Sequence, residues 1–236
     1  MTDEGLPLAT PPFEGASTAS PRAAGVVLAA GTSSRFGDAN KLLATVDGEP
    51  VVRRAARTLV DAGLDPVVVV AGHEADRVRA AVADLPVETV DNDAYEAGQS
   101  TSVRSGIDAL REGEGRDRTE GGGDDGSGPA VDAAVIALGD MPFVDPETVE
   151  TLVAAHAAGV GDALAAAHEG DRGNPVLFDR RFFDRLADVD GDVGGREILL
   201  ADDASALVDV DDPGVRRDVD RPTDLPEGGS KDARDG

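Results

Sequence analysis

The sequence of 236 residues has no cysteine, no tryptophan and only two lysines. Without cysteine there are no disulfides, thiolate metal sites or cysteine nucleophiles. Positive charge is scarce, because 47 acidic residues oppose 22 basic ones and give a net charge of −25. Nucleic acid and anionic membrane surfaces would be repelled, which excludes them as general partners. No apolar run reaches the ~18 residues of a membrane-spanning helix, and the acidic N-terminus does not resemble a signal peptide. We expect a cytoplasmic protein.

The rest of the composition indicates a salt-rich environment. Acidic residues are spread along the whole chain, and aromatic residues make up only 3% of it. At high salt, surface carboxylates stay hydrated and their mutual repulsion is screened. This pattern is typical of a halophilic cytoplasm. The length fits one α/β domain with a sizeable core.

Breaks in composition divide the chain. Residues 1–22 are rich in Pro, Ser, Thr, Gly and Ala without periodicity, which predicts a disordered leader. Residues 112–129 are dominated by glycine and charge and predict a disordered insertion. Residues 226–236 are predicted to form a disordered tail. Because strand and helix patterns resume after the insertion, residues 23–225 are expected to form a single domain.

Strand and helix patterns alternate through this domain. Such alternation predicts a mostly parallel sheet with helices on both faces. Ligands of such sheets bind beyond the carboxyl ends of the strands. The expected strands are 23–30, 66–71, 87–90, 131–138, 163–167, 175–178 and 206–210, and the expected helices are 50–63, 73–84, 99–111, 146–158 and two short ones near 182–186 and 195–200.

Residues 26–41, VVLAAGTSSRFGDANK, run from a buried strand into a glycine-containing loop. The loop is neither a Walker A motif nor the GxGxxG of dinucleotide folds. Gly31 and Gly37 allow close approach of the backbone, and Arg35 and Lys41 add positive charge. A plain strand-to-helix turn is the alternative. One of the two lysines of the whole chain lies in this loop, which favours a phosphate-binding loop.

Other segments carry weaker signals. Asp140 in LGDMPF follows an expected buried strand, where it would suit Mg²⁺, although a turn or capping aspartate is the alternative. Gly98 in GQSTSVRSGI opens a helix rich in hydroxyls, and simple N-capping by Ser100 or Thr101 is the alternative. Asp145 is expected to cap the helix that follows it. The three histidines, at 73, 156 and 168, lack metal-ligand spacing.

The stretch LAAGTSSRFGDANK resembles the signature of the MobA-like nucleotidyltransferases, LAxGxSxRxG followed by Lys. The likeness covers about residues 24–225 and is greatest to the molybdenum cofactor cytidylyltransferase branch, which carries LAAG. It implies a Rossmann-like, three-layer α/β nucleotidyltransferase domain with a mostly parallel sheet. It also implies Mg²⁺-dependent transfer of a nucleotidyl group from a nucleoside triphosphate to a phosphate acceptor, with release of pyrophosphate.

The resemblance also implies roles for individual residues. DVDRPTDL supplies a second metal-facing carboxylate, for which Asp218 is a weaker choice than Asp220. RGNPVLF has Asn174 where the family often has histidine, which leaves the acceptor open. The implied sites are Leu28, Ala29, Ala30, Gly31, Gly98 and Ser102 for the nucleoside, Arg35 and Lys41 for the triphosphate and catalysis, Asp140 and Asp220 for the metal, and Asn174 and Gly195 for the acceptor.

The expected reaction is transfer of CMP from CTP to a molybdopterin-type cofactor, with a molybdenum hydroxylase as the partner enzyme. A guanylyltransferase that uses GTP stays open as an alternative. Its acceptor would be molybdopterin, a cobinamide phosphate, a phospholactate or a sugar phosphate. A non-catalytic cofactor-binding maturation chaperone is an alternative of another class.

Overall fold

A computed structural model describes residues 5–13, 21–33, 36–37, 39–116, 130–188 and 195–226. Its centre is an eight-stranded sheet with the order β1-β10-β8-β9-β7-β2-β5-β6. All neighbours are parallel except β9, which runs antiparallel to β7 and β8. The strands are β1 Leu8–Ala9, β2 Ala23–Ala29, β5 Val67–Ala71, β6 Glu88–Asp91, β7 Ala133–Leu138, β8 Ala163–His168, β9 Asp171–Asp179 and β10 Ser205–Asp209; β3 Thr45–Val46 and β4 Glu49–Pro50 form a separate hairpin.

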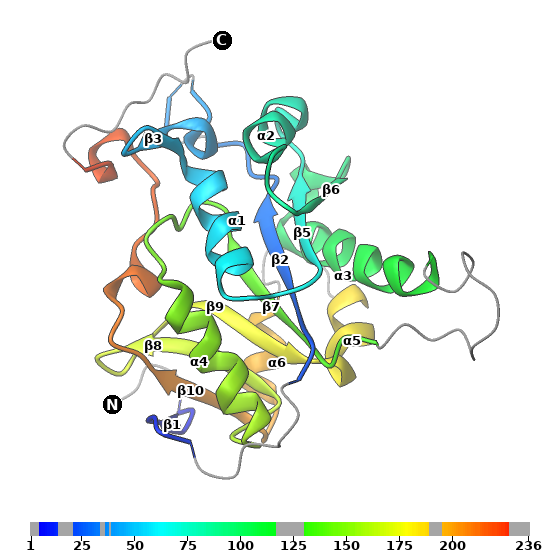
Figure 1. The fold of residues 1–236 in the computed structure, drawn as a ribbon, viewed down its shortest axis with the longest axis vertical. Coiled ribbons are helices and arrows are strands. Elements are labelled where there is room, and N and C mark those ends of the chain that lie inside the picture. Colours follow the sequence, from blue (N-terminus) through cyan, green and yellow to red (C-terminus); the bar gives the residue numbers. More distant parts are fainter. Residues whose placement is uncertain are drawn as a thin grey trace.

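Helices cover both faces of the sheet and give three layers (Figure 1). One apolar cluster joins the sheet to α1, α2 and α4, and a second joins it to α3, α5 and α6. The predicted mostly parallel α/β fold is therefore confirmed. The helices are α1 Val51–Asp61, α2 Ala75–Val82, α3 Gln99–Arg116, α4 Pro146–Ala157, α5 Phe183–Asp188 and α6 Arg196–Ala201.

Strand β9 was predicted as residues 175–178 but begins at Asp171. Because it is antiparallel, its first residues extend past the paired Ile136–Val176 position toward the end of β7. The start of β9 thus lies at the same edge of the sheet as the carboxyl ends of β2 and β7. This arrangement brings Asn174 to the edge where ligands are expected.

Two of the predicted disordered segments hold regular structure. Part of the supposed leader forms β1, which pairs with β10 and accepts a hydrogen bond at Pro7 O from Leu207 N, 2.8 Å away. Two residues held by backbone pairing leave no periodic signal in the sequence. Helix α3 runs on to Arg116, into the supposed insertion, because packing of its apolar stripe stabilises more helix than local composition predicts. Residues 1–4 and 14–20 of the predicted leader, 117–129 of the predicted insertion and 227–236 of the predicted tail fall outside the described residues.

Asp145 occupies the N-cap position of α4 as predicted, but its side chain makes no capping bond. The buried carboxylate of Asp212 holds the residues around this helix start instead. It accepts hydrogen bonds from Asp145 N at 2.9 Å and from Thr148 Oγ1 at 2.8 Å. Its other oxygen accepts from Gly214 N at 2.8 Å. One aspartate thus ties the segment before α4 to the turn at residues 213–216.

Gly214 is expected to tolerate no side chain. A Cβ there would lie 2.0 Å from Phe143 O, a backbone atom that cannot turn away. We expect Gly214→Ala to destabilise the fold by about 1–3 kcal/mol, the usual cost of overpacking. Gly113→Ala on α3 is the matched control, since a Cβ there meets nothing within 4 Å. Thermal unfolding should show a lower Tm for Gly214→Ala alone; equal Tm values would contradict this packing.

Within the described residues, none of the helices combines the length and the apolar character needed to cross a bilayer.

Candidate active site

A cavity of about 500 Å³ opens at the carboxyl edge of the sheet. Its walls come from the ends of β2 and β7, the loop after β2, the start of α3 and the segment near residue 220. The lining residues are Leu28, Ala30, Gly31, Thr32, Ser33, Lys41, Leu42, Tyr95, Glu96, Gly98, Gln99, Ser102, Leu138, Asp140 and Asp220. The cavity thus brings together segments that are far apart in the sequence, as the topology of the sheet predicts.

The two ends of the loop after β2 are fastened together. Ser33 Oγ donates to Asn40 Oδ1 at 3.1 Å and accepts from Lys41 N at 3.2 Å. Asn40 Oδ1 also accepts from Leu42 N at 3.0 Å and caps the short helix Lys41–Leu43. This small ring fixes the backbone from which the side chain of Lys41 extends into the cavity.

The ammonium of Lys41 lies between two carboxylates. Its Nζ is 2.6 Å from Asp140 Oδ2 and 2.6 Å from Asp220 Oδ1. Burial alone would lower the pKa of Lys41, but Asp140 and Asp220 outweigh it and raise that pKa above its usual value. Lys41 is therefore a fixed positive charge at neutral pH, paired with the two aspartates predicted to face a metal.

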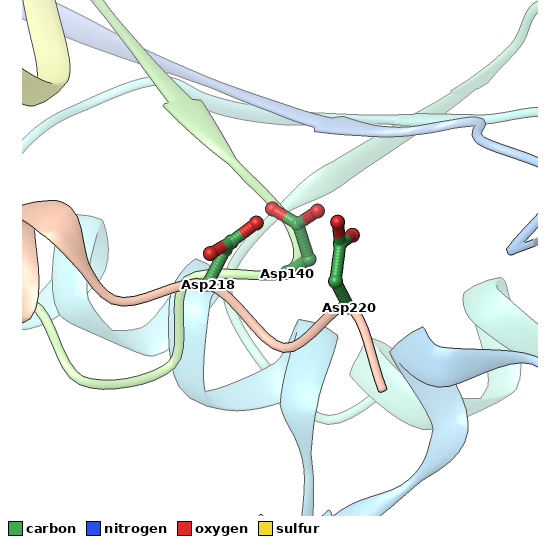
Figure 2. A group of neighbouring side chains, drawn as sticks. All are labelled: Asp140, Asp218 and Asp220. Atoms are coloured by element: carbon green, nitrogen blue, oxygen red, sulfur yellow. The ribbon is translucent and has the colours of Figure 1, made fainter. Parts of the chain in front are cut away.

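A third carboxylate, that of Asp218, joins Asp140 and Asp220 (Figure 2). One oxygen from each of the three lies within 4.8 Å of the others. Burial raises the pKa of Asp218, and the charges of Asp140 and Asp220 raise it further. The family resemblance made Asp218 a weaker choice than Asp220, whereas the structure brings both carboxylates to Asp140.

The donor set fits a divalent cation. The Oδ1 atom of Asp140 is buried and has no hydrogen-bond partner. Three clustered carboxylates carry more negative charge than the single ammonium of Lys41 offsets. Hard divalent cations such as Mg²⁺ prefer carboxylate oxygens combined with phosphate oxygens and water.

The backbone around Asp140 is held from several sides. Gly139 N donates to Leu28 O at 2.9 Å, and Val219 N donates to Asp140 O at 2.9 Å. The second of these bonds places the segment 218–220 directly against Asp140. The acidic cluster therefore depends on backbone pairing between the end of β7 and the last described segment of the chain.

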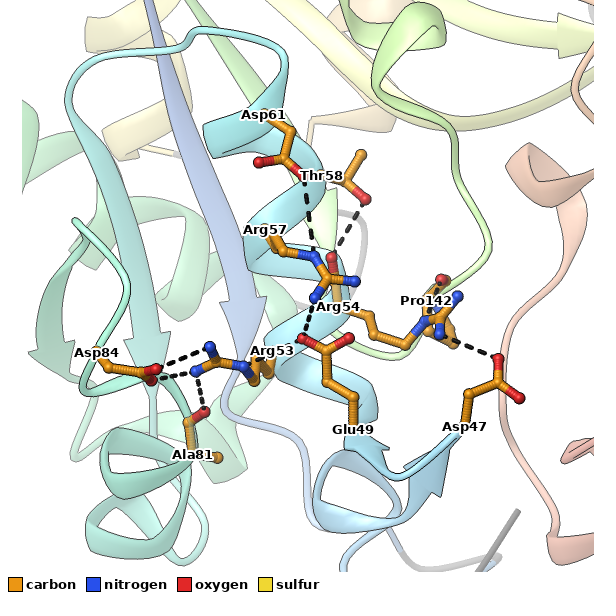
Figure 3. A network of polar contacts seen from close by, with 10 residues as sticks. All are labelled: Asp47, Glu49, Arg53, Arg54, Arg57, Thr58, Asp61, Ala81, Asp84 and Pro142. Atoms are coloured by element: carbon orange, nitrogen blue, oxygen red, sulfur yellow. Dashed lines mark hydrogen bonds and ion pairs between the residues drawn. The ribbon is translucent and has the colours of Figure 1, made fainter. Parts of the chain in front are cut away.

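Helix α1 braces the segment that follows Asp140 (Figure 3). Arg54 Nε donates to Pro142 O at 3.3 Å, and Thr58 Oγ1 donates to Val144 O at 3.0 Å. Arg53 pairs with Asp84 near α2 and with Glu49 on β4. The network fixes α1 between the β3–β4 hairpin, α2 and the segment that follows Asp140.

A second cavity of about 350 Å³ adjoins the first and shares Leu28, Gln99 and Leu138 with it. Its inner wall is apolar, with side chains from β7, β9, α3 and α6. Its polar members are Gln99, Arg172, Asn174 and Arg196. Both residues predicted for the acceptor, Asn174 and Gly195, line this cavity.

Most of the predicted site residues meet at these two cavities. Ala29 does not line either of them, because its side chain is fully buried in the core. Arg35 lies outside the described residues. Sequence reasoning did not single out Tyr95, Gln99 or Arg172. Gln99 and Arg172 lie inside GQSTSVRSGI and RGNPVLF, at the starts of α3 and β9, whereas Tyr95 lies in a short helix outside any motif.

The three histidines contact protein groups away from the cavities. His156 Nε2 lies 3.0 Å from Asp179 Oδ2, and His168 Nδ1 lies 3.0 Å from Val210 O. His73 lies just before α2, 4.0 Å from a Glu74 oxygen. None of the three lines either cavity.

The three-layer fold, with a cavity at the carboxyl edge of its sheet, is of the nucleotidyltransferase class. Residues 25–206 match the model of the MobA-like NTP transferase domain, and the chain belongs to that family. The resemblance noted in the sequence is confirmed.

Curated relatives carry several different names. The chain is 28% identical to nicotine blue oxidoreductase of Paenarthrobacter nicotinovorans, over 85% of this chain and 93% of that protein. It is 33% identical to the bifunctional protein GlmU of Bordetella parapertussis over 57% of this chain, but spans only 27% of that relative. It is 29% identical to a probable molybdenum cofactor guanylyltransferase of Natronomonas pharaonis, over 54% of each.

Solved structures share the fold over most of the chain. Rv0371c of Mycobacterium tuberculosis is 26% identical with a TM-score of 0.68, covering 87% of this chain and 96% of that one. The complex of that protein with manganese is 25% identical with a TM-score of 0.65, covering 86% and 95%. A nucleotidyl transferase of Methanothermobacter is 25% identical with a TM-score of 0.67, covering 86% and 94%.

Proposed function

We propose that this protein transfers CMP from CTP to a molybdopterin-type molybdenum cofactor and releases pyrophosphate. The observation that carries the proposal is the pair of adjoining cavities, with Lys41, Asp140 and Asp220 on the wall of the first and Asp218 beside the two aspartates. The first cavity suits a nucleoside triphosphate. The second, apolar with arginine and amide groups at its rim, suits a ring-bearing anionic acceptor.

Each group in the proposal has a defined task. Leu28, Ala30, Gly31, Gly98 and Ser102 bind the nucleoside. Ala29 acts only through the strand that positions its neighbours. Asn174 and Gly195 bind the acceptor. Asp140 and Asp220, with Asp218 beside them, would hold Mg²⁺, which supplies charge neutralisation for the phosphates when bound.

Nucleotidyl transfer of this kind depends on positioning and charge stabilisation. The acceptor phosphate, held in the second cavity, attacks the α-phosphorus in line. The bond from the α-phosphorus to the bridging oxygen breaks, and pyrophosphate leaves. Lys41, with Arg35 from the same loop, stabilises negative charge that develops on the phosphates.

Two observations support the molybdenum cofactor as acceptor. They differ on whether the base of the donor nucleotide is cytosine or guanine. The LAAG sequence resembles the cytidylyltransferase branch, whereas a relative from Natronomonas is named as a probable guanylyltransferase. GTP is therefore the second candidate donor. A molybdenum hydroxylase is the partner enzyme that the CTP proposal implies.

A nucleotide panel tests the proposal. CTP, GTP, ATP and UTP are each incubated with Mg²⁺ and a molybdopterin-type acceptor, and pyrophosphate release is measured. We expect CTP to give the fastest release, and only with acceptor present. Faster release from GTP would convert the assignment to a guanylyltransferase. No release from any triphosphate would favour the maturation chaperone. A control with nicotine blue and a reduced nicotinamide cofactor tests for the oxidoreductase activity named for one relative, and none is expected.

A further inference from the structure

Behind the first cavity lies a buried side chain that the proposed function does not use. Asn92 follows β6, is 4% exposed, and does not line that cavity. Its Oδ1 accepts a hydrogen bond from Ala94 N at 3.0 Å. Since a backbone amide is always a donor, this contact fixes which end of the side-chain amide is oxygen. The Nδ2 group therefore points toward α3.

Asn92 Nδ2 donates to two hydroxyls in the first turn of α3. The distances are 2.9 Å to Thr101 Oγ1 and 3.0 Å to Ser102 Oγ. An amide nitrogen has no acceptor capacity, so both hydroxyl oxygens must accept these bonds. Each hydroxyl proton must then point elsewhere.

The proton of Thr101 has a protein partner, whereas that of Ser102 has none among the described residues. Thr101 Oγ1 donates to Gly98 O at 2.8 Å, which is nearer than its other acceptor, Ala94 O, at 3.2 Å. Thr101 N approaches the same Gly98 oxygen at 3.3 Å. Gly98 O is the carbonyl one turn back, which a helical serine at position 102 would ordinarily use. With both lone pairs of that oxygen engaged, the Ser102 hydroxyl is left to donate into the cavity that it lines.

We propose that Asn92 is a positioning residue that presents the Ser102 hydroxyl to the nucleotide as a hydrogen-bond donor. The ligand group opposite Ser102 is therefore an acceptor, such as a carbonyl oxygen or ring nitrogen of the base. The inference rests on the proposed function only in assigning this cavity to a nucleoside triphosphate. It specifies that Ser102 is the donor in the contact with the base. It also identifies Asn92, which lies outside the cavity, as the residue that orients this donor.

Three variants test this arrangement by titration calorimetry. Ser102→Ala removes the donor. Asn92→Asp keeps the size of the side chain and the acceptor for Ala94 N, but replaces the NH₂ donor with an acceptor that turns the Ser102 proton away from the cavity. Thr101→Val removes the side-chain donor to Gly98 O and lets Ser102 donate there instead. Thr101→Val does not alter a cavity-lining residue and adds no charge.

The probes are CTP and GTP, each with Mg²⁺ and without acceptor, and inorganic tripolyphosphate with Mg²⁺. For the nucleotide that wild type binds more tightly, we expect Ser102→Ala and Asn92→Asp each to weaken binding about three- to tenfold, and Thr101→Val to weaken it less. Affinity for tripolyphosphate, which has no base, should change less than twofold. The double variant Asn92→Asp/Ser102→Ala should bind as Ser102→Ala does, because both act through one contact.

Additive losses in the double variant would overturn the inference, as would equal losses for nucleotide and tripolyphosphate. It would also fail if Asn92→Asp and Thr101→Val both bound nucleotide as wild type does, or if wild type bound neither nucleotide more tightly than tripolyphosphate. Should Asn92→Asp fail to fold, Thr101→Val decides alone. Because binding is measured without acceptor, a failure of the transfer reaction would leave this result unaffected.

Discussion

Asp140→Asn is expected to abolish metal-dependent pyrophosphate release while leaving the fold intact. The substitution keeps the size of the side chain and still offers one oxygen to Lys41, but it removes the charge at the centre of the acidic cluster. Loss of a group that stabilises charge in phosphoryl chemistry lowers turnover by at least about 10²–10³. Initial rates over a series of Mg²⁺ concentrations, with circular dichroism of each variant, would check this.

Asp145→Asn provides the matched control for that experiment. It removes the same charge five positions further along the same segment, from a side chain that makes no capping bond. We expect its rate and its dependence on Mg²⁺ to equal those of wild type. If Asp140→Asn retained the wild-type response to Mg²⁺, the proposed metal role of Asp140 would be wrong.

Lys41→Ala is expected to change two measurements in opposite directions. Turnover should fall about 10²–10³-fold, because a positive charge near the phosphates is lost. Binding of Mn²⁺ in the absence of nucleotide should become tighter, since the ammonium now 2.6 Å from Asp140 and from Asp220 no longer competes for their oxygens. Rates of pyrophosphate release and a Mn²⁺ titration followed by electron paramagnetic resonance would measure the two effects.

Lys231→Ala is the natural control, because it makes the same substitution at the other lysine of the chain. Both of its measurements should match wild type. A Lys41→Ala protein with near-normal turnover would remove Lys41 from catalysis. A protein with lower turnover and weaker Mn²⁺ binding would instead indicate general damage to the acidic cluster.

Much of the fold could be predicted because the sequence is locally consistent. The apolar runs that form β2, β5 and β7 are bounded by glycine, proline or charged residues, so the ends of these strands can be predicted from the sequence. Strand β1 could not be predicted in this way, since two residues that pair only through their backbone need no particular side chains. The same holds for the five residues, 171–174 and 179, by which β9 exceeds its prediction.

The site was predictable only where a single residue was unusual in the sequence. Lys41 stood out because lysine is so rare here, and Asp140 because it follows a buried strand. The pairing of Lys41 with Asp140 and Asp220 could not be foreseen, because it depends on the Val219–Asp140 backbone bond between distant segments. Asn92 gave no signal at all, since only tertiary structure places it behind Ser102. The roles of all these residues stay predictions until the variants are measured.

Because β9 runs in the reverse direction, sequence changes near the second cavity can occur independently of sequence changes in the loops that line the first. A parallel strand reaches the ligand edge only with its final residues, but β9 reaches it with its first, directly after the turn that joins it to β8. Insertions or substitutions in this one hairpin reshape the second cavity from one side. The loops after β2 and β7 are untouched by such changes. Under the proposed function, the acceptor site could therefore change during evolution while the nucleotide site stays the same, within a single domain.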